Sequence, residues 1–341
     1  MRFTLSSSVL NSQLQTLSRV INSKNSLPIL DCILFEVADG KLTLTASDKE
    51  NVMTVVLALD ACEGTGAFAL PKNMVLDAVK ELPEQPLAFD VNEQTYALSL
   101  YYQNGVYQFV AQSGAEFPKA KAPEQGVTTL NIAVSVLAEN ITRSLFATAQ
   151  DELRPVMNGI YFDLTPDSLA IVASDGHKLV RNRNFTVKSE TPAAFILPSK
   201  PAALLKVMMG KADGEAVVSF DNNSARFVIA DSTLTCRLIE GRYPNYNSVI
   251  PQDNPNTLTV DRKALVGALR RVQPFASEST QSVRLHIEGS KLVVSSEDVD
   301  FAKTAKESMP CDYAGKTMDI GFKCPSLIEI LSNIESDEVT I

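Results

Sequence analysis

The segment KLTLTASD (Lys41–Asp48) occurs again, with small changes, as SLAIVASD (Ser168–Asp175) and as KLVVSSED (Lys291–Asp298). The three copies begin 127 and then 123 residues apart, so the chain of 341 residues repeats itself at a long period. Each copy reads as one strand. The sequence therefore predicts three related units of about 125 residues each.

A second alternating segment that ends in turn residues precedes each copy. These segments are ILFEVADG (Ile33–Gly40), IYFDLTPD (Ile160–Asp167) and VRLHIEGS (Val283–Ser290). Two alternating segments joined by a tight polar turn are typical of a β-hairpin. We therefore expect one such hairpin in every unit.

Two helices are predicted in each unit. Apolar residues at spacings of four and three, such as Leu10, Leu14 and Leu17, predict an amphipathic helix at the start of the unit. A second helix follows a proline near its first turn, where the missing N–H costs nothing. The second helices are introduced by FALPKNMVLDAVKEL (Phe68–Leu82), FILPSKPAALLKVM (Phe195–Met208) and IGFKCPSLIEILSNI (Ile320–Ile334). With further strands after each helix, the fold class is α+β, built from three tandem strand-helix-strand repeats.

Segments rich in Pro, Gly, Asn and charge near residues 118–127 and 250–257 are the expected linkers. They divide the chain into domains 1–125, 126–253 and 254–341. The third unit ends at Glu338–Ile341, which aligns with the strand around Val217, and we expect it to lack its last 34 or so residues. Because edge strands of tandem copies can pair, three copies suggest a quasi-symmetric ring that exposes no edge.

The composition is that of an ordinary globular chain, with 45% hydrophobic and 21% charged residues and no Trp. We expect neither secretion nor a membrane span, because the first residues do not resemble a signal peptide and no long apolar stretch occurs. Five widely spaced cysteines without a CxxC motif indicate reduced thiols in the cytoplasm. They predict no disulfide framework and no zinc site.

The net charge of −9 argues against binding of nucleic acid only if acidic and basic residues are spread evenly over the chain. Three of the six predicted helices, at 8–24, 199–211 and 261–273, are net basic, whereas the strands and loops are acidic. A single basic helix is most often just a solvated face. Across the set, the pattern favours a surface that tolerates a polyanion through loose contacts that do not depend on base sequence.

Little in the sequence indicates catalysis. Of the two histidines, His286 lies in a predicted strand, and His177 lies in SDGHKL (Ser174–Leu179) beside Asp175. An acid–base pair is conceivable there, but no nucleophile elbow accompanies it, and Asp-Gly is more simply a turn. Nucleotide-binding and HExxH metal motifs are absent from the sequence. We therefore predict no catalytic residue, no metal and no cofactor.

The segments RPVMNG (Arg154–Gly159), VASDGHKL (Val172–Leu179) and EGRYPNY (Glu240–Tyr246), inside a threefold repeat, resemble the bacterial sliding clamps, the β subunits of replicative DNA polymerase III. The resemblance covers the whole chain. It implies three clamp domains per chain and a homodimer that closes a six-domain ring, with helices inside and sheets outside. The basic helices would then face encircled double-stranded DNA.

The resemblance also implies three sets of site residues. The groove that binds partner peptides maps to Met157, Ser174, Gly176, His177, Lys178, Leu179, Pro244 and Val249. The DNA-contacting residues map to Lys24, Lys72, Gln150, Arg154, Lys200 and Lys206. The dimer interface maps to Tyr107, Phe109, Phe275, Glu297, Asp298 and Asp300. Tyr243 stands where the family commonly has Phe, and Lys178 where it commonly has Arg.

The function implied is that of a non-enzymatic processivity factor. It would tether the polymerase III catalytic subunit, other DNA polymerases and repair proteins through short linear peptides, and a clamp loader driven by ATP would place it on DNA. The alternative is a repeat-built scaffold for protein interactions that does not encircle DNA.

Overall fold

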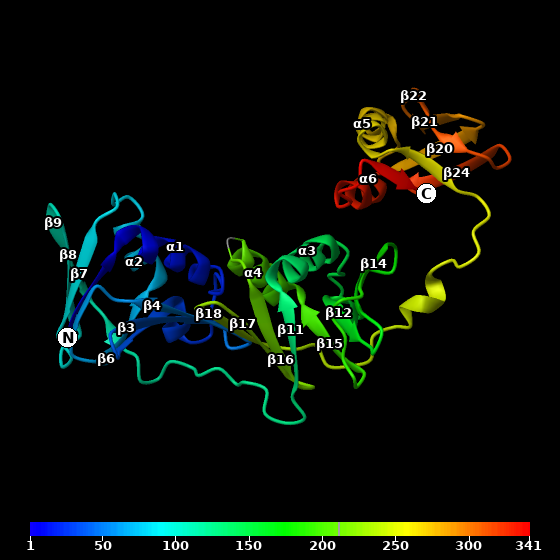
Figure 1. Cartoon of the computed structure of the whole chain (residues 1–341). Coiled ribbons are helices and arrows are strands. Elements are labelled where there is room, and N and C mark those ends of the chain that lie inside the picture. Colours follow the sequence, from blue (N-terminus) through cyan, green and yellow to red (C-terminus); the bar gives the residue numbers. More distant parts are fainter. Residues whose placement is uncertain (211) are drawn as a thin grey trace. The chain divides into compact units, whose positions relative to one another are not determined.

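The computed structural model describes residues 1–210 and 212–341 and divides them into two compact units, Met1–Tyr243 and Pro244–Ile341 (Figure 1). The first unit holds two of the predicted repeats and the second unit holds the third. Lys211, the last residue of one predicted basic helix, lies outside the described residues.

The first unit follows the predicted order of strand, helix, strands, helix, strands, twice over. Its first repeat contains β1 (Arg2–Ser6), α1 (Ser7–Ser18), β2 (Cys32–Ala38), β3 (Lys41–Ser47), β4 (Asn51–Ala58), β5 (Ala61–Glu63), β6 (Gly66–Pro71), α2 (Lys72–Val79), β7 (Pro86–Val91), β8 (Ala97–Tyr102), β9 (Gly105–Val110) and β10 (Gln112–Ser113). Its second repeat contains β11 (Thr128–Ala133), α3 (Val134–Leu145), β12 (Gly159–Leu164), β13 (Leu169–Ser174), β14 (Leu179–Asn184), β15 (Ala193–Pro198), α4 (Ser199–Met209), β16 (Glu215–Phe220), β17 (Ser224–Ile229) and β18 (Ser232–Arg237).

The second unit contains the third repeat. Its elements are β19 (Leu258–Asp261), α5 (Arg262–Val272), β20 (Ser282–Glu288), β21 (Lys291–Asp298), β22 (Lys303–Pro310), β23 (Asp312–Tyr313), β24 (Met318–Lys323), α6 (Cys324–Ser332) and β25 (Glu338–Thr340). The strands form two sheets, in the orders β22-β21-β20-β24 and β23-β19-β25. β25 pairs with β19 as β16 pairs with β11 in the second repeat.

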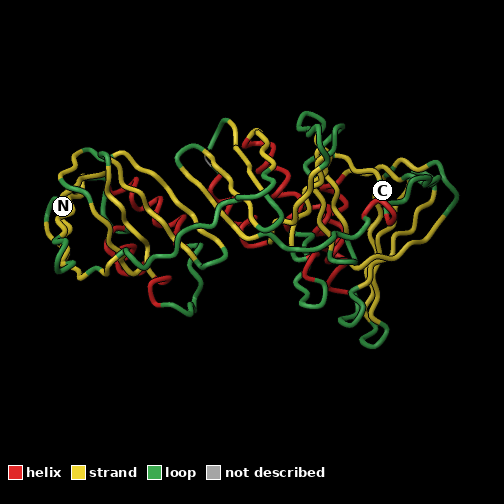
Figure 2. Tube along the Cα trace, turned by 90° about the horizontal axis from the view of Figure 1, so that it is seen from below, coloured by secondary structure: helices red, strands yellow, loops and turns green. Residues whose placement is uncertain are grey.

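A nine-stranded sheet joins the two repeats of the first unit, in the order β10-β6-β2-β3-β4-β18-β17-β16-β11. The junction is the antiparallel pair β4 and β18, in which Thr54 lies opposite Thr233. A five-stranded sheet, β5-β1-β7-β8-β9, and a four-stranded sheet, β14-β13-β12-β15, complete the unit. Within this unit the helices lie on one side of the nine-stranded sheet, above its strands in Figure 1 and behind them in Figure 2.

The helices pack in pairs, α1 with α2, α3 with α4 and α5 with α6. Two of them have side-chain caps, because Ser6 Oγ accepts from the N–H of Val9 at 3.2 Å and Asp261 Oδ1 accepts from the N–H of Ala264 at 2.6 Å. The first helix is shorter than the predicted segment 8–24 and ends at Ser18. It therefore carries no charged side chain, and Lys24 lies in the loop that follows.

The sheets and helices enclose a core rich in Phe, Leu and Val. In the first repeat Phe3 stacks on Phe89 with ring centroids 4.7 Å apart, and Phe35 stacks on Phe68 at 5.0 Å. All four rings are almost fully buried. A fully buried Phe stabilises a fold by about 1.5–3 kcal/mol, so burial of these rings favours the folded state of the first repeat.

Candidate functional site

The turn between β13 and β14 brings together five of the predicted groove residues. Ser174 Oγ donates to the carbonyl of Lys178 at 2.8 Å and accepts from the N–H of Gly176 at 3.1 Å. Gly176 adopts a φ of +89°, which glycine reaches without steric cost. His177 is exposed at the tip of this turn, and Leu179 begins β14.

Asp175 is the residue that shapes this turn. Its Oδ1 accepts from the N–H groups of His177 and Lys178, each at 2.9 Å, and its Oδ2 lies 3.1 Å from the Lys178 ammonium. Partial burial opposes ionisation of the carboxyl, but these N–H groups and the ammonium together hold the pKa of Asp175 below its ordinary value. The carboxylate is thus occupied in fixing the backbone, as expected for an Asp-Gly turn.

Arg154 lies against the same turn. Its Nη1 is 2.6 Å from the point where a Cβ on Gly176 would stand, and its Nε donates to Asp151 at 2.8 Å. Met157, at the end of the 3-10 helix Pro155–Met157, is buried. We therefore count Arg154, which the sequence analysis placed among the DNA contacts, with the groove residues. Its position three residues before Met157 is the signal that could have indicated this.

Tyr243 lies beneath the groove residues and carries an unusual hydroxyl group. Its ring stacks on Tyr161 with centroids 4.7 Å apart and planes 1° from parallel. In residues 1–210 and 212–341, the buried Tyr243 hydroxyl has no hydrogen bond of good geometry, although the backbone N–H of Ser174 lies near enough to lower its pKa slightly. Burial raises the pKa of this phenol to about 12. The remaining two predicted groove residues, Pro244 and Val249, are exposed and belong to the second unit.

The side chains of the predicted DNA contacts differ in solvent exposure and in whether they already bind other groups of the protein. Lys24, Gln150 and Lys206 are exposed. Lys72 is half-buried and donates to the carbonyl of Ile21 at 3.2 Å. Free ammonium groups contact phosphate most readily, so Lys24 and Lys206 are the strongest candidates of the set.

Lys200 joins the two repeats of the first unit. Its Nζ donates to the carbonyl of Val20 at 2.8 Å, and it also binds the Asn22 side chain and forms an ion pair with Asp48. The Asp48 side chain is only 4% exposed. Lys200 extends from α4 in the second repeat, and its partners all lie in the first repeat, so its charge is already neutralised inside the protein.

The predicted interface residues of the first unit lie on β9, an edge strand of the five-stranded sheet. Tyr107 and Phe109 are half-buried, with ring centroids 6.3 Å apart, and Tyr107 packs against Tyr102 at 4.8 Å. Their neighbours Val106 and Val110 face solvent, 44% and 72% exposed. An exposed apolar edge strand is suited to pair with another strand.

The predicted interface residues of the second unit lie near β22, the edge strand of its four-stranded sheet. Phe275, Glu297 and Asp300 are exposed. Asp298 is buried, and its Oδ1 accepts from the N–H groups of Asp300 and Phe301, so it shapes the β21–β22 turn and does not project as a surface charge. Sequence reasoning missed two exposed apolar residues in that turn, which are Val299 at 83% and Phe301 at 69%.

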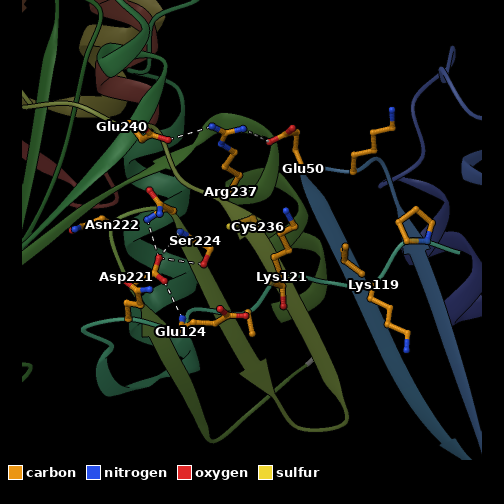
Figure 3. Close-up of a pocket in the computed structure, with 17 residues that line it drawn as sticks. Glu50, Lys119, Lys121, Glu124, Asp221, Asn222, Ser224, Cys236, Arg237 and Glu240 are labelled. Carbon is orange, nitrogen blue, oxygen red and sulfur yellow. Dashed lines mark hydrogen bonds and ion pairs between the residues drawn. The ribbon is translucent and has the colours of Figure 1, made fainter.

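A cavity of about 790 Å³ lies where the loop before β11 passes the β4–β18 junction (Figure 3). Arg237 lies between Glu240, at 3.2 Å, and Glu50, at 3.8 Å. Asp221 accepts from the N–H of Glu124 at 3.0 Å, which fastens the loop to the second repeat. Acidic and basic side chains are balanced in its lining, and no predicted site residue is among them.

The described residues contain no group of three or more His, Cys, Asp or Glu side chains arranged to hold a metal ion. Within the same residues, no helix has the length and apolar character that a membrane crossing requires.

Comparison with known proteins identifies relatives of the whole chain. Residues 1–119, 131–245 and 247–341 match the N-terminal, central and C-terminal domain families of the DNA polymerase III β subunit. The β sliding clamp of Synechococcus elongatus is 30% identical, over 97% of this chain and 90% of the relative. That of Pseudomonas aeruginosa is 26% identical, over 99% of this chain and 92% of the relative.

Solved structures show the same fold. The sliding clamp of P. aeruginosa bound to griselimycin matches with a TM-score of 0.94 and 25% identity, over the full chain and 92% of that structure. The β subunit of Thermotoga maritima matches with a TM-score of 0.90 and 25% identity, over 99% of this chain and 91% of that structure. The predicted fold of three tandem α+β clamp repeats is confirmed.

Proposed function

Because this chain belongs to the β-subunit family of DNA polymerase III, the bacterial sliding clamps, we propose that two copies close a ring around double-stranded DNA. The match of all three domain families along the chain is the observation that supports this proposal most strongly. The protein is a non-catalytic processivity factor, so its role is to tether other proteins and not to convert a substrate. We place the domain boundaries as predicted, at 1–125, 126–253 and 254–341, and the protein in the cytoplasm.

DNA would be held by topology more than by affinity. With a net charge of −9, the chain as a whole repels a polyanion, and Lys72 and Lys200 are already engaged by groups of the protein itself. Lys24 and Lys206 would contact phosphates, with Gln150 as a polar neighbour. Weak phosphate contacts that read no base sequence allow a protein to slide along DNA.

Partners would bind through short linear peptides. The turn Ser174–Leu179 presents backbone and side-chain polar groups beside the partly exposed Leu179, with Arg154 against it, and such a mixture suits a short peptide with apolar anchors. The related P. aeruginosa clamp binds griselimycin. We propose that the catalytic subunit of the polymerase, the clamp loader and other polymerases and repair proteins use this site in turn, and that Pro244 and Val249 contribute to it.

Retention on circular DNA tests the ring. The labelled protein is loaded onto nicked circular plasmid with a clamp loader and ATP, and is then separated from free protein by gel filtration before and after the plasmid is cut once. A clamp stays with the circle and is lost after linearisation. Equal retention on both forms would indicate an ordinary DNA-binding protein, and no retention on either would favour the scaffold alternative.

A further inference from the structure

Lys24, one of the two lysines proposed to contact phosphate, is exposed in the loop 20–27 that follows α1. The loop begins with Val20 and Ile21, whose side chains are buried. The residues from 22 to 27 form neither helix nor strand. Contacts with other elements must therefore set the position of the Lys24 side chain.

Two lysines from different repeats bind consecutive carbonyl groups of this loop. Lys72 begins α2, and its Nζ donates to the carbonyl of Ile21 at 3.2 Å. Lys200 lies in the first turn of α4, and its Nζ donates to the carbonyl of Val20 at 2.8 Å. The helices α1 and α4 are neighbours across the junction between the repeats (Figure 1). The loop is therefore held from both repeats at once.

The Lys200 ammonium has three N–H donors, and three acceptors lie within hydrogen-bond distance of it. These acceptors are the carbonyl of Val20, Oδ1 of Asn22 and Oδ2 of Asp48. The Asp48 side chain is only 4% exposed, and its Oδ1 accepts from the N–H of Asn51 at 2.7 Å. Moving the Lys200 ammonium to a phosphate would leave this carboxylate without its cation. Lys200 therefore has no N–H group to spare for DNA.

The second half of the loop is fixed as well. Asn25 Nδ2 donates to Asp31 Oδ1 at 2.7 Å, and Lys49 Nζ donates to Ser26 Oγ at 2.7 Å. Among the described residues, none forms a hydrogen bond or ion pair with the Lys24 side chain. The loop is thus tied down on both sides of Lys24, and the Lys24 ammonium stays available to a ligand.

We propose that Lys72 and Lys200 are positioning residues, which hold the loop 20–27 so that Lys24 presents its ammonium to DNA phosphates. The proposal rests on the proposed function. It reassigns two residues that the sequence analysis placed among the direct DNA contacts. Because Lys200 belongs to the second repeat, the phosphate contact of the first repeat depends on the junction between the two.

The benefit of holding the loop is a matter of population. A loop that is already in its binding position need not be ordered when DNA binds. If the loop occupied that position only about a third of the time, the apparent dissociation constant of the Lys24 contact would rise about threefold. A positioning residue therefore changes affinity only through the contact it serves, whereas a direct contact changes affinity by itself.

Asn22→Ala loosens the loop with little risk to the fold. Asn22 is exposed, and its loss leaves the ion pair of Lys200 with Asp48 and the hydrogen bond to the carbonyl of Val20 in place. Ser23→Ala is the matched control, because Ser23 is the next exposed polar residue of the loop and, in the described residues, forms no bond with either lysine.

Binding of a short fluorescently labelled duplex, followed by anisotropy over a series of salt concentrations, measures both effects. Lys24→Ala should lower the slope of log K against log salt by about 1, as the loss of one phosphate contact does. Asn22→Ala should weaken binding about threefold when Lys24 is present and not at all in the Lys24→Ala background. Lys206→Ala, at a separate contact, should weaken binding by the same factor in both backgrounds.

Lys200→Gln separates positioning from direct contact. In the Lys24→Ala background it should leave the salt slope unchanged, since Lys200 contributes no phosphate contact of its own. Trypsin reports the loop without DNA. Cleavage after Lys24 should be faster in Asn22→Ala than in Ser23→Ala, with cleavage after the exposed linker residues Lys119 and Lys121 as the internal reference.

Four results would overturn the positioning role. They are an Asn22→Ala effect of full size in the Lys24→Ala background, no effect of Asn22→Ala when Lys24 is present, a further loss of slope with Lys200→Gln, and equal cleavage after Lys24 in the two loop variants. All four leave the proposed ring in place. A parent protein that binds no duplex, or a Lys24→Ala variant that binds as the parent does, would instead contradict the proposed phosphate contact itself.

Discussion

Removing the Tyr243 hydroxyl should stabilise the protein. In Tyr243→Phe the ring keeps its stack on Tyr161, and the oxygen that is lost makes no hydrogen bond of good geometry in the described residues, with only the backbone N–H of Ser174 near it. A buried hydroxyl without a partner costs about 1–3 kcal/mol relative to water. Against this, the gap left by one oxygen forfeits a few contacts worth about 0.1–0.2 kcal/mol each. The expected net gain is about 1 kcal/mol in the free energy of unfolding.

Tyr313 provides the matched control. It is 7% exposed, as Tyr243 is, but its hydroxyl donates to the carbonyl of Lys316 at 2.7 Å. Tyr313→Phe removes that hydrogen bond, and we expect it to destabilise the protein by about 0.5–1.5 kcal/mol. The two substitutions delete the same atom and should change stability in opposite directions.

Urea unfolding followed by circular dichroism measures both variants, and hydrogen exchange with mass spectrometry assigns each change to its own unit. The slope of the free energy against urea should stay that of the parent, because the same surface is exposed on unfolding. If Tyr243→Phe lost stability as Tyr313→Phe is expected to, the Tyr243 hydroxyl would have a partner in solution and the reasoning from burial would be wrong.

Three further predictions follow from charged groups and thiols. Asn73 occupies the place in the first repeat that Lys200 has in the second, two residues after the proline that ends β6 or β15, and Asp298 corresponds to Asp48. Asn73→Lys should therefore lower the dimer dissociation constant about fivefold, as an ion pair worth about 1 kcal/mol would. Light scattering against protein concentration measures this constant, and Asn73→Gln should leave it unchanged. The Arg284 guanidinium and, to a smaller extent, His286 lower the pKa of Asp319 from 3.8 to about 2. The Asp319 carboxylate therefore stabilises the fold above about pH 4, and this contribution is lost as the pH falls from 4 toward 2. The urea midpoint of Asp319→Asn should fall less between pH 6 and pH 3 than that of the parent protein. Burial raises the pKa of Cys236 to about 12, so brief alkylation of the folded protein at pH 8 should label the partly exposed Cys62 and leave Cys236 unmodified, as peptide mass spectrometry would report; early labelling of Cys236 would contradict its burial.

The repeat was the most predictable part of the fold. The hairpins expected at 33–48 and 283–298 are β2–β3 and β20–β21, because alternation and turn residues are local properties that the sequence states directly. The end of α1 was predicted less well. Residues after Ser18 include Asn22, Ser23 and Asn25, whose side chains compete for backbone hydrogen bonds, and these signals outweigh the apolar spacing.

Pairing between distant strands was beyond the reach of the sequence. Nothing local to β4 or β18 states that Thr54 meets Thr233, because both segments read simply as alternating strands. The same limit applied to the charged site residues. Lys200 and Asp298 were expected on the surface, but each is engaged by groups that folding alone brings near, so composition could not indicate their roles.

The Lys200 contact has a mechanical consequence. Within a chain, the backbone hydrogen bonds between β4 and β18 are reinforced by this ammonium, so we expect the two repeats of the first unit to resist separation. Between two copies of the proposed ring, Asn73 stands in the place of Lys200 and would offer no charge to the partner's Asp298. In a ring of identical chains, the contact between copies would then separate more easily than the β4–β18 junction within a chain, and a clamp loader would open the ring there.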